Sequence, residues 1–291
     1  MLNEKNVLGK TFRRLRKSRK MSISVVSKQI TSRSSLQRWE NNEGEMSVEK
    51  VIKLLKRIHI QPQEYIDLLG MSSFDFDIAE LEVAYRENNI KLLKELVTIL
   101  LEKHSNNLQD VQLLFEAAMA CNFYYDLSNI DLFPSEEKIR LKLYFSSIDE
   151  WTRENVIFFA NVQLYLSSSD IYTLAQSLFS YLIEQPDTNK FYMMAIDALI
   201  NAVFALIKKK SLDKAIHMLK RLEYLNLSTK YSGAKVRIEF MEILIDCICK
   251  KDTISMYTFI NNLNAVGLLK EAENYKFTFH QILESYHILI D

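Results

Sequence analysis

A short polar segment near the N-terminus, TSRSSLQRWENNEGEMS at residues 31–47, places Ser, Arg and Gln on a predicted helix that ends in Trp-Glu. Ser32 is a good N-cap for a helix from Arg33 to about Asn41. Leu36 and Trp39 face inward, which leaves the polar side chains outside. Arg, Gln and Ser are the residue types that bind base edges and phosphates in DNA. The predicted contact residues are Arg33, Ser34, Ser35, Gln37 and Arg38.

A basic stretch comes before this segment. Leu8, Phe12 and Leu15 form the apolar face of a helix over residues 7–19. The other positions carry a run of cations: Lys10, Arg13, Arg14, Arg16, Lys17, Arg19 and Lys20. A charge run usually indicates a solvated face, but such faces normally mix signs, and no acid lies between Glu4 and Glu40. The pattern favours phosphate contact, which we expect at Arg13, Arg14 and Lys17.

The composition predicts an all-α protein with two domains. The chain has 291 residues but only 5 Gly and 3 Pro, too few for the turns of an all-β or α/β fold. The net charge of zero is unevenly distributed, because residues 1–70 carry a net +8 and residues 71–291 a net −8. We therefore expect a polyanion-binding domain at 1–70 and a second domain at 71–291.

The basic domain resembles the XRE-type helix-turn-helix domain. Caps at Ser22, Ser32 and Ser47, Pro62 at a first helical position and Gly70 at an end predict five short helices. The segment SRSSLQRWENNEGEMSVEKVIKLLKRIHI is similar to that family's third helix and the segment that follows it. The resemblance implies DNA contacts at Ser34, Ser35, Gln37 and Arg38, although Ile30-Thr31 stands where the family usually has a glycine in the turn.

The acidic domain is predicted to be a right-handed solenoid of about five helix pairs followed by a terminal helix. The pairs recur at about 40 residues, close to the period of a tetratricopeptide-like repeat. Their expected ranges are 75–87 with 89–104, 107–126 with 135–150, 153–168 with 170–185, 188–209 with 211–225 and 230–250 with 252–265, and the terminal helix spans 268–288. Such a solenoid has a concave inner surface.

Three asparagines mark one position of successive repeats. Asn122, Asn161 and Asn201 are 39 and 40 residues apart on apolar stripes. A lone Asn there is usually a core group bonded internally, whereas three at one repeat position fit a ladder of amides along an extended peptide. Phe158, Tyr165 and Phe204 would take its apolar side chains. Arg153 and Arg237 are either partners of an acidic group or peptide carboxylate, or members of surface salt bridges.

Taken together, the chain resembles the Rgg-type regulators. GKTFRRLRKSRKMSIS, SRSSLQRWENNEGEMS and WTRENVIFFANVQLYLSSSDI at 151–171 carry the likeness. The resemblance implies a homodimeric transcription factor whose solenoid binds a short signalling peptide. We expect it to bind double-stranded DNA at a near-palindromic operator and to dimerise through the terminal helix, with Leu268, Leu269, Phe277, Phe279, Ile282 and Leu283. Two alternatives remain: a helical-repeat adaptor or inhibitor of a protein partner, and a DNA-binding regulator of a non-peptide effector.

Other classes of function find little support in the sequence. The five His are scattered without an H-E-x-x-H motif, and five glycines supply no phosphate-binding loop. Cys121, Cys247 and Cys249 have neither metal-ligand spacing nor a nearby His. We expect no enzyme, no cofactor and no metal. The segment MLNEKNVLGK has no apolar signal core, and no run approaches the ~18 apolar residues of a membrane span. We therefore expect a cytoplasmic protein without a membrane partner.

Overall fold

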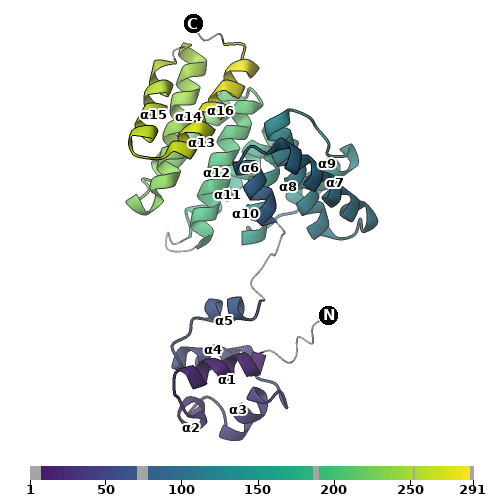
Figure 1. Cartoon of the computed structure of the whole chain (residues 1–291), viewed down its shortest axis with the longest axis vertical. Coiled ribbons are helices and arrows are strands. Elements are labelled where there is room, and N and C mark those ends of the chain that lie inside the picture. Colours follow the sequence, from purple (N-terminus) through teal and green to yellow (C-terminus); the bar gives the residue numbers. More distant parts are fainter. Residues whose placement is uncertain (1–7, 71–77, 186–189, 252, 289–291) are drawn as a thin grey trace. The chain divides into compact units, whose positions relative to one another are not determined.

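The computed structural model describes residues 8–70, 78–185, 190–251 and 253–288. The chain splits into two compact units, Met1–Phe76 and Asp77–Asp291. Within the described residues every regular element is a helix, and there is no strand. The all-α fold class with a five-helix head and a body of paired helices is confirmed (Figure 1).

The N-terminal unit consists of five short helices: α1 (Leu8–Ser18), α2 (Ile23–Ser27), α3 (Arg33–Glu40), α4 (Val48–Arg57) and α5 (Pro62–Leu68). Two predicted caps form hydrogen bonds, since Ser22 accepts from the Val25 N–H and Ser32 from the Ser35 N–H. Ser47 occupies the cap position of α4 without a side-chain bond. Gly70, beyond α5, has a φ of 65°, the left-handed conformation that a glycine adopts without strain.

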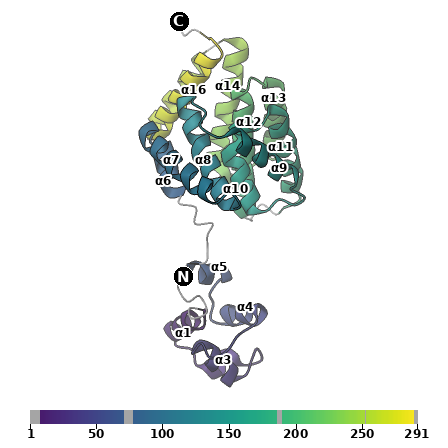
Figure 2. The ribbon, with the colours of Figure 1, turned by 90° about the vertical axis from the view of Figure 1, so that its right-hand side faces the viewer.

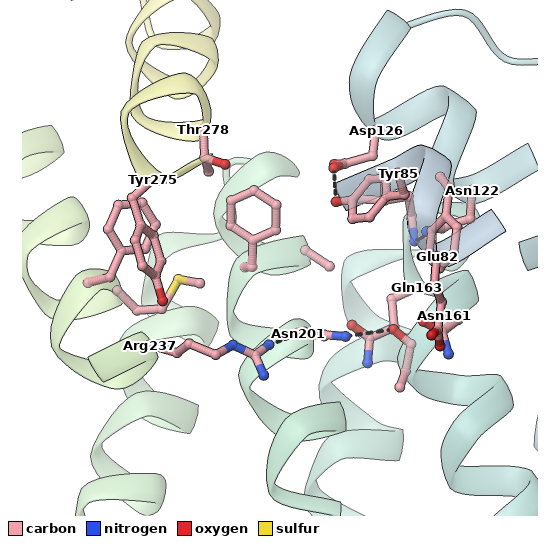
Figure 3. Close-up of a pocket in the computed structure, with 17 residues that line it drawn as sticks. Glu82, Tyr85, Asn122, Asp126, Asn161, Gln163, Asn201, Arg237, Tyr275 and Thr278 are labelled. Atoms are coloured by element: carbon pink, nitrogen blue, oxygen red, sulfur yellow. Dashed lines mark hydrogen bonds between the residues drawn. The ribbon is translucent and has the colours of Figure 1, made fainter. Parts of the chain in front are cut away.

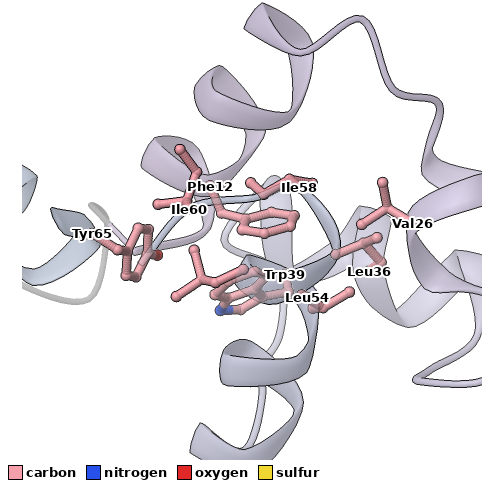
Figure 4. Close-up of a cluster of buried hydrophobic side chains, with 9 residues drawn as sticks. Phe12, Val26, Leu36, Trp39, Leu54, Ile58, Ile60 and Tyr65 are labelled. Carbon is pink, nitrogen blue, oxygen red and sulfur yellow. The ribbon is translucent and has the colours of Figure 1, made fainter. Parts of the chain in front are cut away.

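One apolar cluster holds these helices together (Figure 4). Phe12 of α1 packs on Trp39 of α3 with ring centroids 5.2 Å apart. Leu36, the second inward residue of α3, is fully buried beside them. The remaining buried members of the cluster are Val26, Leu54, Leu55, Ile58, Ile60 and Tyr65. The inward face of α3 is therefore the one expected from the spacing of Leu36 and Trp39.

Two close contacts fix α3 against α1. A Cβ atom at Gly9 would lie 1.9 Å from the Trp39 carbonyl oxygen, so only glycine permits this approach. The buried Arg16 guanidinium donates two hydrogen bonds to the Glu40 carboxylate, each at 2.6 Å. Arg16 also donates to the Met21 carbonyl oxygen at 2.7 Å. Arg16, a member of the basic run that was not among the expected phosphate contacts, is thus paired inside the unit.

The C-terminal unit contains the predicted pairs. They are α6 (Ile78–Arg86) with α7 (Ile90–Asn106), α8 (Val111–Ser128) with α9 (Ser135–Ser146), α10 (Arg153–Val162) with α11 (Ser168–Leu182), α12 (Lys190–Lys208) with α13 (Leu212–Tyr224), and α14 (Ser232–Lys250) with α15 (Ile254–Ala265). The terminal helix is α16 (Leu269–Ser285), and short 3₁₀ turns η2 (Gln163–Tyr165) and η3 (Thr229–Tyr231) follow α10 and precede α14.

Helix α12 is the centre of this unit. It packs against α10, α11, α13 and α14. Phe191–Lys208 is also the one described segment long and apolar enough to cross a membrane by length and composition, a property the sequence analysis did not anticipate. Most of that segment is buried inside the unit. Its apolar character is accounted for by packing against these four neighbouring helices.

The last helix returns to the early helices of the unit (Figure 2). The amide of Gln281 in α16 donates to the Asp126 carbonyl oxygen in α8 at 3.3 Å. The Asp126 carboxylate, only 6% exposed as a residue, accepts hydrogen bonds from the Tyr85 hydroxyl in α6 and the Lys208 ammonium in α12. Helices α6, α8, α12 and α16 therefore meet at one buried residue, Asp126.

We predict that Arg16→Met destabilises the N-terminal unit by about 3–5 kcal/mol, because it leaves the Glu40 carboxylate buried without a countercharge. The double variant Arg16→Met/Glu40→Leu should recover much of that loss. Hydrogen exchange of the α1 and α3 amides in the intact chain measures both. Glu49→Gln, which removes an exposed ion pair with Lys53, is the control and should change nothing measurable. Equal loss in the single and double variants would contradict the prediction.

Candidate DNA interface and ligand groove

The polar side chains of α3 lie on the surface of the N-terminal unit. Arg33, Ser34, Ser35, Gln37 and Arg38 are all exposed, while Leu36, Trp39 and Glu40 are buried. On α1, Arg13, Arg14 and Lys17 are exposed as well. All eight residues expected to bind DNA are therefore exposed, as contact with DNA requires.

Several of these side chains already have partners at the ends of α3. The Ser32 hydroxyl lies 3.0 Å from the Ser34 hydroxyl and donates to that of Ser35 at 2.8 Å. Arg38 donates to the Glu43 carbonyl oxygen at 3.1 Å, and Arg13 donates to the Asn41 side-chain oxygen at 2.8 Å. The serines thus contribute to the helix cap, and Arg13 and Arg38 hold the chain that leaves α3. In the described part of the chain, the side chains of Gln37 and Arg33 are exposed and have no hydrogen-bond partner.

A hollow of about 360 Å³ lies in the C-terminal unit, and we call it the groove (Figure 3). It is lined only by the first helix of each pair, by the turn η2 and by α16. The lining residues are Glu82, Tyr85, Asn122, Phe123, Asp126, Ala160, Asn161, Gln163, Leu164, Asn201, Phe204, Ala205, Arg237, Phe240, Met241, Tyr275 and Thr278. This is the inner surface expected of a solenoid of helix pairs.

The three repeat-spaced asparagines all line the groove, but each is partly engaged by the fold. Asn122 accepts the Leu164 N–H at 3.1 Å, and Asn161 donates to the Ile157 carbonyl oxygen at 2.8 Å. Asn201 donates to the Ala160 carbonyl oxygen at 3.0 Å and accepts from Arg237. Among the described residues, the Asn122 amide nitrogen and the Asn161 amide oxygen have no such protein partner. Asn201 thus differs from the other two, because both its amide nitrogen and its oxygen bond within the protein.

A break in the third pair explains why these amides are needed. Helix α10 ends at Val162, and the chain tightens into the 3₁₀ turn η2 before α11 begins. The Asn122 side chain satisfies the freed Leu164 N–H, and the Lys209 ammonium satisfies the Leu164 carbonyl at 2.8 Å. Gln163 donates to the Ala198 carbonyl oxygen at 3.0 Å, while its own buried amide oxygen has no partner in the described structure.

Charges on opposite sides of the groove are paired within the protein. Arg237 of α14 donates to the Asp197 carboxylate at 2.8 Å and to Asn201, both in α12. On the other side, burial and then the charge of Asp126 raise the pKa of the Tyr85 hydroxyl well above its ordinary value. Tyr85 therefore stays protonated and donates to Asp126. Glu82 is exposed at the rim.

Three residues expected at the peptide do not line the groove. Phe158 is 1% exposed and stacks between Phe115 and Phe145 in the core, and Arg153 is exposed at the start of α10 away from the hollow. Tyr165 packs on Tyr125 and Phe133 outside the groove. The turn to 3₁₀ geometry at Gln163 accounts for Tyr165, because the expectation assumed one continuous helix over 153–168. Phe158 lies before the turn, in the same helix as Asn161, but it faces Phe115 and Phe145 in the core.

Other lining residues were absent from the sequence expectation. Asp126 lies one turn after Asn122 in α8, a spacing that could have indicated it. Gln163 follows Asn161 closely but lies beyond the end of α10. Tyr85 and Tyr275 come from the first and last helices of the unit, and no local pattern shows that they meet the same hollow.

We predict that Phe158→Ala destabilises the C-terminal unit by about 3–5 kcal/mol, as expected for removal of a fully buried aromatic side chain. Arg153→Ala should leave stability unchanged, because the side chain is exposed. Urea unfolding of the full chain, followed by circular dichroism, measures both. A Phe158→Ala protein as stable as the natural one would place this ring outside the core.

Comparisons with known proteins agree with both units. Residues 80–277 match the family model of the HTH-type transcriptional regulator Rgg, C-terminal domain, and residues 12–65 match a helix-turn-helix model. A search of the curated proteins finds no match.

Several solved structures have the same fold. The SHP pheromone receptor Rgg2 of Streptococcus dysgalactiae is 20% identical with a TM-score of 0.73, over 94% of this chain and 100% of that one. A putative transcriptional regulator from Listeria monocytogenes EGD-e is 17% identical with a TM-score of 0.71, over 98% and 99%. PrgX in its complex with cCF10 is 16% identical with a TM-score of 0.69, over 96% and 92%.

The Rgg family model covers well over half of the chain, through the helices that build the groove, and the helix-turn-helix model covers the unit that presents α3. The chain belongs to the Rgg family of helix-turn-helix transcriptional regulators.

Proposed function

We propose that this regulator binds an operator through α1 and α3, and that a short signalling peptide in the groove controls its activity. The observation that carries the peptide is the set of amide atoms at the groove that have no protein partner in the described structure. Similarity of fold supports it, since Rgg2 is described as a pheromone receptor and PrgX was solved with cCF10. In this proposal the first unit is the DNA-binding domain and the second the ligand-binding and dimerisation domain.

The groove offers what an extended backbone needs. The Asn122 amide nitrogen is a donor for a peptide carbonyl, and the side-chain oxygen of Asn161 is an acceptor for a peptide N–H group. The two residues lie on the same side of the groove in Figure 3. The opposite side presents Tyr275 together with the apolar Phe240 and Met241. Backbone bonds on one side and apolar contacts on the other are the usual way to bind a short peptide.

Arg237 is the proposed partner of an acidic group or of the peptide carboxylate. Its present partner Asp197 has a side chain 47% exposed, and an ion pair in contact with water contributes little to stability. A ligand carboxylate could therefore replace Asp197 at Arg237 at small cost. Phe204 beside Asn201 would contact an apolar ligand side chain.

Arg153, Phe158 and Tyr165 are not included in this ligand site. The role is one of binding, without catalysis, and we place it in the cytoplasm, where a regulator meets DNA.

We also propose a homodimer on a near-palindromic operator, because one small helix-turn-helix buries too little surface for tight specific binding. The terminal helix contributes less than its sequence suggested. Phe279, Ile282 and Leu283 are core residues, whereas Leu268, Leu269 and Phe277 are 39%, 62% and 37% exposed. Leu269 and Phe277 of α16, together with the exposed Val266 before the helix, form the apolar surface that a second copy would cover.

Gln37→Ala and Arg38→Ala should each weaken binding to the cognate operator by about 1–3 kcal/mol and have far less effect on random DNA, because these side chains contact bases. Lys17→Ala is the matched control, a phosphate contact whose loss should weaken binding to both duplexes alike. Electrophoretic mobility shifts at fixed salt measure all three. If Gln37→Ala weakens both duplexes equally, this helix does not contact bases.

Asn161→Ala should abolish the response to peptide while leaving the fold and basal operator binding intact. Its amide donates only within its own helix, so its removal strands no other side chain. Asn201→Ala, by contrast, should lower the melting temperature, because Arg237 and the Ala160 carbonyl both lose a partner. Asn261→Ala, an exposed change on α15, is the control. A reporter gene and thermal melting give the two readouts, and an Asn161→Ala protein that unfolds would refute the ligand role.

A further inference from the structure

A second hollow of about 480 Å³ lies on the far side of Arg237 and Tyr275 from the amides of the groove. It is formed by α12, η3, α14, the end of α15 and the start of α16. Its apolar lining consists of Met193, Tyr231, Val236, Leu263 and Leu268. Met193 is 50% exposed and Leu268 39% exposed, so apolar surface faces this space without being covered by the described chain. Such surface is suited to an apolar ligand group.

Only side chains separate the two hollows. Arg237 and Tyr275 line both, and Figure 3 shows them on the side of the groove opposite Asn122 and Asn161. The Arg237 side chain is 31% exposed, and one half of its guanidinium holds Asn201 in the groove while the other half holds Asp197 in the second hollow. An ion pair in contact with water contributes little to stability, so the Arg237 side chain between the two hollows can move aside for a ligand.

The backbone of α14 also leaves room there. Gly233 and Ala234, in the first turn of the helix, line the second hollow. A Cβ atom built on Gly233 meets no atom within 4 Å. The small side chains therefore do not serve close packing between helices, unlike Gly9 in the N-terminal unit. They keep open a space that larger residues would fill.

Other hollows lie on this unit as well. One, between α14 and α15, shares Val236 and Leu263 with the second hollow but includes neither Arg237 nor Tyr275. Two more lie between α13 and α14, and Glu223 and Glu242 line both. Burial and the nearby Glu223 raise the pKa of Glu242 to about 7. Neither shares a residue with the groove. The second hollow shares Arg237 and Tyr275 with the groove, and its largely apolar lining, bordered by Asp197, Lys230 and Glu271, is suited to an uncharged side chain.

We propose that the second hollow is a further compartment of the ligand site and receives a bulky apolar side chain, aliphatic or aromatic, at one end of the bound peptide. The peptide backbone lies along the amides of the groove, passes Arg237, and places that side chain against Met193, Val236 and Leu268. This inference rests on the proposed peptide function and specifies where the selectivity of the ligand arises.

The test uses the full chain and an mRNA-displayed library of random octapeptides. A selected octapeptide is synthesised with a fluorescent label, together with truncations from each end, and dissociation constants are measured by anisotropy. Ala234→Phe fills the second hollow, and Leu268→Trp fills it from the other side. Lys235→Phe is the matched control, because it adds the same ring one residue away on an exposed position. Thermal melting verifies the fold of each variant.

We expect Ala234→Phe and Leu268→Trp to weaken the octapeptide by about tenfold or more, the effect of excluding one large apolar side chain. Lys235→Phe should bind as the natural protein does. Truncation from one end should erase the difference between Ala234→Phe and the natural chain, because the shortened peptide no longer reaches the hollow.

Three results would overturn the inference. Unchanged affinity in both filling variants, with binding lost in Asn161→Ala, would retain the peptide function and remove the second compartment. Equal weakening of the octapeptide and of every truncated peptide would assign the effect to the fold. Failure of the library to yield any binder to the natural chain would refute the peptide function and this inference together.

Discussion

The buried carboxylate of Asp126 is the point on which the geometry of the C-terminal unit depends. Tyr85 from α6 and Lys208 from α12 bond to this carboxylate, and Gln281 from α16 bonds to the carbonyl oxygen of the same residue. A buried charge is tolerated only when it is paired and hydrogen-bonded, so these partners cannot separate without a large penalty. The first, middle and last helices are held around one hollow as a result. The groove therefore depends on the contact of the last helix with the early helices as well as on the repeated helix pairs.

Some polar atoms of that hollow bond within the protein, and others have no protein partner. The break after Val162 engages the Asn122 oxygen and the Gln163 amide nitrogen, and both polar atoms of Asn201 bond within the protein. The Asn122 amide nitrogen and the Asn161 amide oxygen remain without a partner in the described structure, on the side of the groove opposite Tyr275. The Gln163 amide oxygen also lacks a partner there, but it is buried within the protein.

In the N-terminal unit, two close contacts fix one helix against another and so decide which side chains reach the surface. Gly9 lets α1 approach the end of α3, and the Arg16–Glu40 pair holds the two helices in one register. The inward residues of α3 are thereby fixed, and its polar residues are presented together on the surface. A rigid helix with exposed Arg, Ser and Gln is suited to the major groove, where small errors of placement would cost base contacts.

The amino-acid sequence determined the elements of this protein, because caps, apolar spacing and turn residues act over only a few neighbours. The five short helices, the five pairs and the terminal helix were predictable in this way, as was the outward face of α3. The repeat spacing of Asn122, Asn161 and Asn201 was enough to predict that all three line the groove.

Only the tertiary structure decided which atoms of those side chains are free, since that depends on partners up to 42 residues away, as for Asn122 and Leu164. It likewise placed Arg16 and Phe158 in cores, where distant Glu40 and Phe115 meet them, and brought Tyr275 to the groove by the return of α16. Local patterns carry no information about such contacts, because they arise from how the helices close on one another.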